Sequence, residues 1–231
     1  DAGEIFHDEI VTAFGSNGIG KTTFAKMLAG VEEPTSGEVD TEVTIAYKPQ
    51  YIVSDFEGTV SDFLYMNAPS FGSNIFKSEI MEPFKLEDML EKEVKKLSGG
   101  ELQRVAIAAT VLREGDFYYF DEPTSWLDVS QRLNAVKVIR SLAQDGKSVL
   151  VIEHDLATLD ALSDNIHVLF GEPGGYGVVS GRKGVRIGIN AYINGFLAEE
   201  NVRIRRNPIE FTIRPPTPED EGESLSSYSD L

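Results

Sequence analysis

Residues Gly15-Ser16-Asn17-Gly18-Ile19-Gly20-Lys21-Thr22 decide the fold, because they fit G-x-x-x-x-G-K-[ST], the pattern of a phosphate-binding loop. An apolar run at 9–14 predicts a buried strand before the loop, and residues 23–29 predict a helix after it. Glycines let the backbone close around a phosphate with its N–H groups pointing inward. The start of the helix adds a partial positive charge. The stretch therefore predicts a polyphosphate site between a strand and a helix.

Composition limits the classes of protein that remain. The chain has 231 residues and is 41% hydrophobic, which suits one large domain, or one domain with appendages. It has no cysteine, so we expect no disulfide and no iron–sulfur cluster held by this chain, which fits a reducing cytoplasm. No apolar run approaches the roughly 20 residues that cross a bilayer, so we expect no membrane span. The net charge of −17 repels nucleic acid at long range, so an RNA partner requires local basic patches.

The order of the other predicted elements indicates an α/β fold. Apolar runs at 43–47, 117–120, 148–152 and 166–170 predict strands, and residues 129–144 and 156–162 predict helices between them. Alternating strands and helices indicate a mainly parallel sheet flanked by helices. A helical subdomain is expected at about 55–112, with helices at 59–64, 77–84, 87–96 and from Ser98 onward.

The last part of the chain has a different composition. We expect a hairpin within 171–184 and a short helix within 185–196. Proline, acidic residues and serine dominate 215–231, which predicts a disordered acidic tail or hinge linker after a nucleotide-binding domain at 1–214.

Polar residues follow the predicted strands where a bound phosphate would lie. Asp121 and Glu122 end the strand at 117–120, so Asp121 is expected to hold Mg²⁺ together with Thr22. Glu122 is placed to polarise the attacking water. Gln50 and His154 also follow strands: Gln50 could ligate Mg²⁺ or sense the γ-phosphate, and His154 could hydrogen-bond its oxygens. Taken alone, each of these last two residues is more often an ordinary loop residue.

A second anion site is predicted at Ser98-Gly99-Gly100-Glu101, where small residues open a helix. One chain would then have two phosphate sites for one nucleotide. The simplest arrangement is a face-to-face pair of domains, in which each domain contributes this second site to the ATP of the other.

Taken together, these motifs and the turn at 125–128 stand in the order found in an ATP-binding-cassette (ABC) domain, which the sequence resembles. The resemblance implies that Glu122 is the catalytic carboxylate, that His154 is the switch histidine, and that Asp128 links the two sites. It also implies that Ser98 and Gly100 touch the γ-phosphate across the dimer. Mg²⁺ would be bound by Thr22, Gln50 and Asp121. The implied nucleotide-binding residues are Gly15, Ser16, Asn17, Gly18, Ile19, Gly20, Lys21, Thr22, Thr23, Ser98, Gly99, Gly100, Glu101 and Asp128.

Six segments narrow the resemblance, because they are similar to ABC subfamily E, the RNase L inhibitor family, in its archaeal form: residues 17–24, 45–50, 97–107, 128–140, 151–156 and 199–205. Members of that family are soluble twin-cassette ATPases that split ribosomes into subunits, and they carry an iron–sulfur domain. Here residues 1 to about 110 resemble the second cassette, and residues from about 113 resemble the first, as in a hybrid.

The family resemblance implies a cytoplasmic ATPase that works in ribosome recycling. Its cassette partner would be a second copy or a full-length family member, and ribosomal RNA is a further expected partner. The basic residues expected to face RNA are Arg182, Lys183, Arg186, Arg203, Arg205 and Arg206.

Two other functions share the ATP motifs. One is the energy-coupling ATPase subunit of a membrane transporter, although the segments at 128–140 and 199–205 argue against it. The other is a non-hydrolysing remnant that binds nucleotide, which the single cassette favours.

Overall fold

The computed structural model of the chain describes residues 8–28, 30–37, 44–49, 56–67 and 76–209. Its strands are β1 (Ile10–Gly15), β2 (Ile45–Lys48), β3 (Phe117–Asp121), β4 (Ser148–Ile152), β5 (Asn165–Glu172), β6 (Tyr176–Val179), β7 (Lys183–Gly184), β8 (Phe196–Leu197) and β9 (Val202–Arg203). Its α-helices are α1 (Lys21–Leu28), α2 (Val60–Asn67), α4 (Glu82–Phe84), α5 (Gly99–Val111), α6 (Val129–Gln144), α7 (Leu156–Leu162) and α8 (Val185–Asn194).

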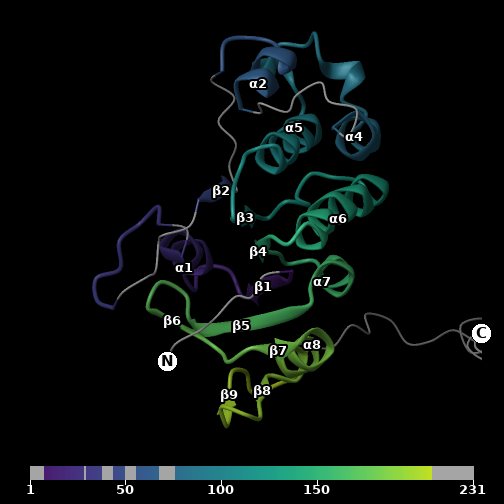
Figure 1. The fold of residues 1–231 in the computed structure, drawn as a ribbon. Helices are drawn as coiled ribbons and strands as arrows, with labels where there is room; N and C mark the ends of the chain where they lie inside the picture. Colours follow the sequence, from purple (N-terminus) through teal and green to yellow (C-terminus); the bar gives the residue numbers. More distant parts are fainter. Residues whose placement is uncertain (1–7, 29, 38–43, 50–55, 68–75, 210–231) are drawn as a thin grey trace, which may run out of the picture.

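The main sheet is mostly parallel, as predicted. Its order is β2-β3-β4-β1-β5-β6, with β7 also paired to β5. The pairs from β2 through β5 are parallel, whereas β6 and β7 run antiparallel to β5. The expected hairpin after β5 is β5–β6, and a separate small hairpin joins β8 to β9. Figure 1 shows the sheet between α1 on one side and α6, α7 and α8 on the other.

Alternation along the strands divides the apolar residues of the sheet between its two faces, and a third, smaller cluster packs Ile166 and Val168 of β5 against α8. Val11 and Ala13 of β1 and Leu150 of β4 belong to the cluster that contains Ala25 of α1. Ile10 of β1 faces the opposite way and belongs to a larger cluster with residues of α5 and α6. A sheet with both faces covered favours strands that are apolar along nearly their whole length, and the fully buried β1 and β4 are apolar except for Thr12 and Ser148.

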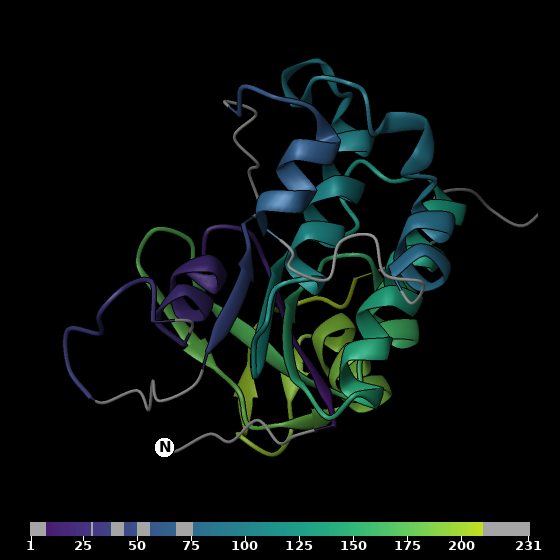
Figure 2. The same cartoon turned by 45° about the horizontal axis from the view of Figure 1, so that its top comes forward.

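The helices within residues 56–112 stand together beyond the β2–β3 end of the sheet, as Figure 1 and Figure 2 show. The expected helix at 77–84 begins with a π-helical turn, Lys77–Met81, and continues as α4. The expected helix at 87–96 was wrong, because only two 3₁₀ turns form there, Glu87–Met89 and Val94–Lys96. The chain between them pairs with the start of α2: Val60 N–H donates to Lys92 O, and Val94 N–H donates to Gly58 O.

The parallel strands bring their carboxyl ends to one edge of the sheet. Strands β1, β3 and β4 are neighbours or next neighbours in that order, and each leads into a segment that carries predicted site residues. Open parallel sheets bind ligands at this edge.

Residues 210–231 lie outside the described residues, so the boundary of the tail stays a prediction.

Candidate functional site

The turn between β1 and α1 is shaped by its glycines. Gly18 and Gly20 have φ angles of +77° and +89°, a region that other residues rarely adopt. Gly15 is required for a different reason: a Cβ added there would lie 2.2 Å from the Leu169 carbonyl oxygen. The loop thus follows a path that this pattern of glycines allows and larger residues would block.

Lys21 begins α1 and points back into the loop. Its side chain is 6% exposed, and its ammonium donates to the carbonyl oxygens of Gly15 (3.0 Å) and Ser16 (2.6 Å). Burial lowers the pKa of Lys21 to about 8, while the charges of Glu122 and Asp121 oppose this shift. The mouth of the loop therefore holds a desolvated cation close to two carboxylates.

Asp121, at the end of β3, fits the role of a magnesium ligand. It is 0% exposed, and neither carboxylate oxygen has a hydrogen bond of ordinary geometry to another described residue. Burial raises the pKa of Asp121, and the nearby hydroxyls of Thr22 and Tyr119 oppose this rise. Paired acceptor oxygens without donors, next to a hydroxyl, suit a hard cation. Gln50, the third expected ligand, lies outside the described residues.

Protein side chains supply only part of such a metal shell. Among the described residues, no group of three or more His, Cys, Asp or Glu side chains could hold a metal ion. Mg²⁺ commonly takes one or two protein ligands and completes its shell with phosphate oxygens and water. Asp121 and Thr22 therefore fit a metal that arrives with a nucleotide.

Glu122 and His154 face each other across the ends of β3 and β4. His154 Nε2 lies 3.1 Å from Glu122 Oε1, and the Ser125 hydroxyl lies 3.1 Å from Glu122 Oε2. Burial lowers the pKa of His154, as does the charge of Lys21, while Glu122 and Glu153 oppose them. A lowered pKa leaves the imidazole neutral at pH 7. A carboxylate beside a neutral imidazole can accept a proton from water and orient it.

Three buried polar residues that support these groups were missed by the sequence interpretation. Glu153 accepts hydrogen bonds from the N–H groups of His154 (2.7 Å) and Asp155 (3.2 Å), which fixes the turn after β4. Gln103 of α5 donates to the carbonyl oxygen of Glu122 (2.7 Å). The ammonium of Lys48, in β2, donates to the carbonyl oxygen of Asp121 at the end of β3. A polar residue inside an apolar strand pattern is a usable signal for Lys48, whereas Gln103 looks like any polar helix residue.

The second predicted anion site begins α5 with a capping box. The Ser98 hydroxyl donates to Glu101 Oε2 (2.8 Å), and the Ser98 N–H donates to the same oxygen (2.9 Å). The ring of Trp126 lies over Gly99, where an added Cβ would be 3.5 Å from it, yet Trp126 is 80% exposed. Asp128 caps α6 by accepting from the Gln131 N–H (2.8 Å). The helix start, the tryptophan and Asp128 therefore form one exposed surface.

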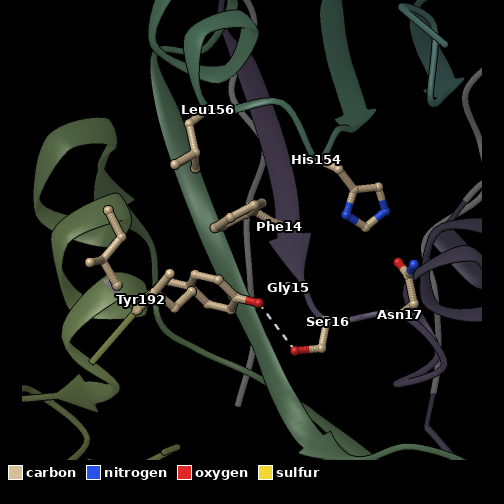
Figure 3. Close-up of a pocket in the computed structure, with 9 residues that line it drawn as sticks. Phe14, Gly15, Ser16, Asn17, His154, Leu156 and Tyr192 are labelled. Carbon is tan, nitrogen blue, oxygen red and sulfur yellow. Dashed lines mark hydrogen bonds between the residues drawn. The ribbon is translucent and has the colours of Figure 1, made fainter. Parts of the chain in front are cut away.

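A pocket of about 410 Å³ lies beside the phosphate-binding loop (Figure 3). Its polar residues include Ser16, Asn17 and His154, and the Tyr192 hydroxyl of α8 lies 3.1 Å from the Ser16 hydroxyl. The Tyr192 ring also packs edge-on against Phe14, with ring centroids 4.5 Å apart. Helix α8 thus forms one wall next to the loop.

The basic residues expected to face RNA are partly used within the fold. Lys183 is 4% exposed, and its ammonium contacts the carboxylates of Glu199 and Glu200. Arg182 pairs with Glu9. The expectation that Lys183 faces RNA was therefore wrong, because burial of its charge is compensated inside the protein.

Known proteins resemble this chain over most of its length. The family described as ABC transporter matches residues 2–125. An uncharacterized ABC transporter ATP-binding protein of Methanocaldococcus jannaschii is 46% identical over 209 residues, covering 89% of this chain and 34% of that protein. ABC transporter E family member 3 of Arabidopsis thaliana is 40% identical over 145 residues, covering 60% of this chain and 80% of that protein.

A solved structure agrees with these relatives. It holds an archaeal ribosome recycling factor in complex with the ribosomal stalk protein, and it matches with a TM-score of 0.80 and 43% identity. That match covers 96% of this chain and 43% of the other, so this chain spans less than half of the recycling factor. Among the described residues, no helix is long and apolar enough to cross a membrane. The chain belongs to the ATP-binding-cassette family, in its subfamily E.

Proposed function

We propose that this chain binds ATP with Mg²⁺ and hydrolyses ATP to ADP and phosphate when two cassettes close face to face. The observation that carries the proposal is the gathering of Lys21, Asp121, Glu122 and His154 at one sheet edge, with His154 Nε2 3.1 Å from Glu122 Oε1. The site residues assigned from the sequence are part of this proposal.

The loop binds the phosphates. Its N–H groups and the start of α1 favour an anion, and the Lys21 ammonium exchanges its two carbonyl partners for phosphate oxygens. The Lys21 pKa of about 8 leaves the group mostly cationic at pH 7, and a bound phosphate strengthens that charge. Asp121 and Thr22, with Gln50, would hold Mg²⁺, which would offset the negative charge of the phosphates.

Glu122 and His154 act on the attacking water. The carboxylate of Glu122 orients the water and accepts its proton as the water oxygen bonds to the γ-phosphorus. The bond between that phosphorus and the bridging oxygen breaks, and ADP leaves with the electron pair. The neutral His154 imidazole lies with Nε2 3.1 Å from the carboxylate and is placed to contact the γ-phosphate.

The partner cassette completes the site. Gly99 and Gly100 begin α5 on an exposed surface, so a second cassette can bring them to the γ-phosphate. The partner is a second copy of the chain or a full-length family member. Closure of the pair then couples hydrolysis to a movement of the two cassettes.

We infer that this movement separates ribosomal subunits in the cytoplasm. The support is the similarity to the archaeal ribosome recycling factor, of which this chain spans 43%. Arg206 is exposed, and Arg186 is exposed with one long contact, 3.8 Å to Asp160 Oδ1, so both can reach ribosomal RNA, in contrast to Lys183.

Two measurements test the proposal. Glu122→Gln is expected to abolish steady-state phosphate release, leaving at most a slow single-turnover rate, while retaining ATP and promoting dimers, because the amide cannot accept the proton. Phosphate release by the unaltered protein, absent from the variant, supports hydrolysis; no release by either supports the non-hydrolysing remnant.

The ribosome part of the proposal is tested by sedimentation with and without a non-hydrolysable ATP analogue. Nucleotide-dependent migration with ribosomal subunits is the expected result. Recovery of a membrane protein partner instead of ribosomes would favour the transporter subunit.

A further inference from the structure

Lys48 is a lysine inside the core. It lies next to the sheet edge where β3 and β4 end at Glu122 and His154, which we call the catalytic edge. It ends β2, is 0% exposed, and its ammonium donates to the carbonyl oxygens of Asp121 (2.8 Å) and Glu122 (3.5 Å). Burial lowers the pKa of Lys48 to about 8, and the charges of Asp121, Glu122 and Glu153 oppose this shift. A buried cation is costly unless its surroundings compensate for lost water, so a neutral residue would be the simpler choice for packing alone.

Lys48 contacts the backbone at Asp121 and Glu122, and the backbone conformation of Glu122 is unusual. Glu122 has a φ of +46°, in the left-handed region that costs residues other than glycine free energy. Its carbonyl oxygen accepts from Gln103 Nε2 (2.7 Å) as well as from Lys48, and its N–H donates to the Ile152 oxygen (2.9 Å). Such a conformation persists only where the surrounding structure holds it.

The direction of the Glu122 carboxylate depends on that peptide. With φ positive, the side chain leaves the strand at an angle that brings it to the Ser125 hydroxyl and to His154 Nε2. If Glu122 relaxed to a negative φ, its Cβ would turn away from this pair. A shift of about 1 Å in a reacting group can cost about 100-fold in rate.

We propose that Lys48 is a positioning residue for the catalytic carboxylate: its buried ammonium holds the Asp121–Glu122 backbone so that Glu122 keeps the left-handed conformation facing His154. This inference rests on the proposed ATPase function. In the sequence, Lys48 stands directly before Pro49 and the predicted ligand Gln50. A lysine that only packed in the core would affect stability. A positioning lysine should in addition affect the rate of the chemical step.

The kinetic test compares Lys48→Met with Lys183→Met. Both variants remove a buried ammonium, but Lys183 pairs with Glu199 and Glu200, away from the catalytic edge. Lys48→Met is expected to lower kcat about 100-fold with KM for ATP changed less than about threefold. Lys183→Met is expected to leave both constants unchanged. Equal kcat values for Lys48→Met and the unaltered protein would overturn the proposal.

A double-mutant cycle separates positioning from general loss of stability. In a Glu122→Gln background the carboxylate is gone, so Lys48→Met should lower the residual rate little further. A loss as large as in the unaltered protein would mean that Lys48 acts independently of Glu122. Lys48→Gln, which keeps a neutral donor, is the second variant if the methionine protein does not fold, and it should recover part of kcat.

A crystal structure of Lys48→Met gives a readout that does not need hydrolysis. The expected result is a Glu122 φ outside the left-handed region and a Glu122–His154 separation longer than 3.1 Å. A Glu122 that keeps its conformation overturns the positioning role even if the protein is inactive. Absence of phosphate release from the unaltered protein would overturn the ATPase proposal, while this structure still decides the role of Lys48.

Discussion

At the scale of single residues, the site depends on charged groups held without their usual water. Lys21, Lys48 and Asp121 are all buried, and burial shifts the pKa of each group toward its neutral form. The lysine shifts are opposed by the carboxylates that end β3. Opposite charges at short range thus keep one another ionised. The phosphates of a bound nucleotide would add further negative charge next to Lys21.

Lys21→Ala is expected to weaken ATP binding roughly 10- to 100-fold, because it removes charge-assisted hydrogen bonds to the phosphates. Isothermal titration calorimetry with ATP and Mg²⁺ measures the change. Lys26→Ala is the matched control: it lies on the same helix, and its ammonium pairs with Glu32, 3.1 Å away, rather than with the loop. Equal affinities for the unaltered protein and Lys21→Ala would contradict the proposal that Lys21 binds the phosphates of ATP.

At the scale of secondary structure, helix α5 connects two functions. Its first turn carries the proposed second anion site, and the capping box of Ser98 and Glu101 fixes this turn. One turn later, Gln103 donates to the carbonyl oxygens of Glu122 and Pro123. A change in the position of α5 therefore reaches Glu122, the proposed catalytic carboxylate, through a side chain that is itself buried.

Glu101→Gln is expected to reduce stability in a pH-dependent way. Hydrogen bonds from Lys92 and Ser98 lower the pKa of Glu101 from 4.5 to about 2, so its charge stabilises the fold above about pH 4.5. That contribution is lost as the pH falls toward 2. At pH 7 the variant should be less stable by about 1 kcal/mol, because a neutral acceptor replaces a charged one.

Chemical denaturation between pH 7 and pH 3 measures this difference. The gap between the two proteins should narrow as the pH falls below about 4.5. Glu79→Gln, at an exposed position in the first π-helical turn, controls for the change in net charge. A gap that stays constant across this range would contradict the assigned role of the Glu101 charge.

The sequence was enough to predict the elements whose apolar pattern is long and local. The loop, its flanking strand and helix, and the strands of the parallel sheet follow from this pattern. The segment 87–96 could not be predicted, because its backbone pairs with residues 58–60, a contact that charge and periodicity do not reveal. Lys48 was missed because its partners are backbone carbonyls at the end of another strand.

At the scale of the whole molecule, the sequence matches the phosphate-binding loop pattern once, and the proposed second anion site lies at the start of α5, which we call the signature helix. Lys21 and the Ser98–Gly100 segment begin different helices, α1 and α5, in different parts of the fold (Figure 1). A symmetric pair can bring the loop of one copy to the signature helix of the other and so form two equivalent sites.

Mixing two inactive variants tests this pairing. Lys21→Ala keeps the signature helix but loses the loop lysine, whereas Ser98→Arg blocks the helix and keeps the loop. Random pairing gives mixed dimers with one intact site, so the mixture should recover about a quarter of the unaltered phosphate release rate. Each variant alone is the control. A mixture as inactive as its parents would indicate a partner other than a second copy.

The sole tryptophan of the chain, Trp126, lies in this proposed interface, packed over Gly99 and 80% exposed. Its indole emission therefore changes when a facing cassette displaces water from the ring. The protein carries a built-in optical reporter, and assembly around ATP can be followed in real time without attaching a dye.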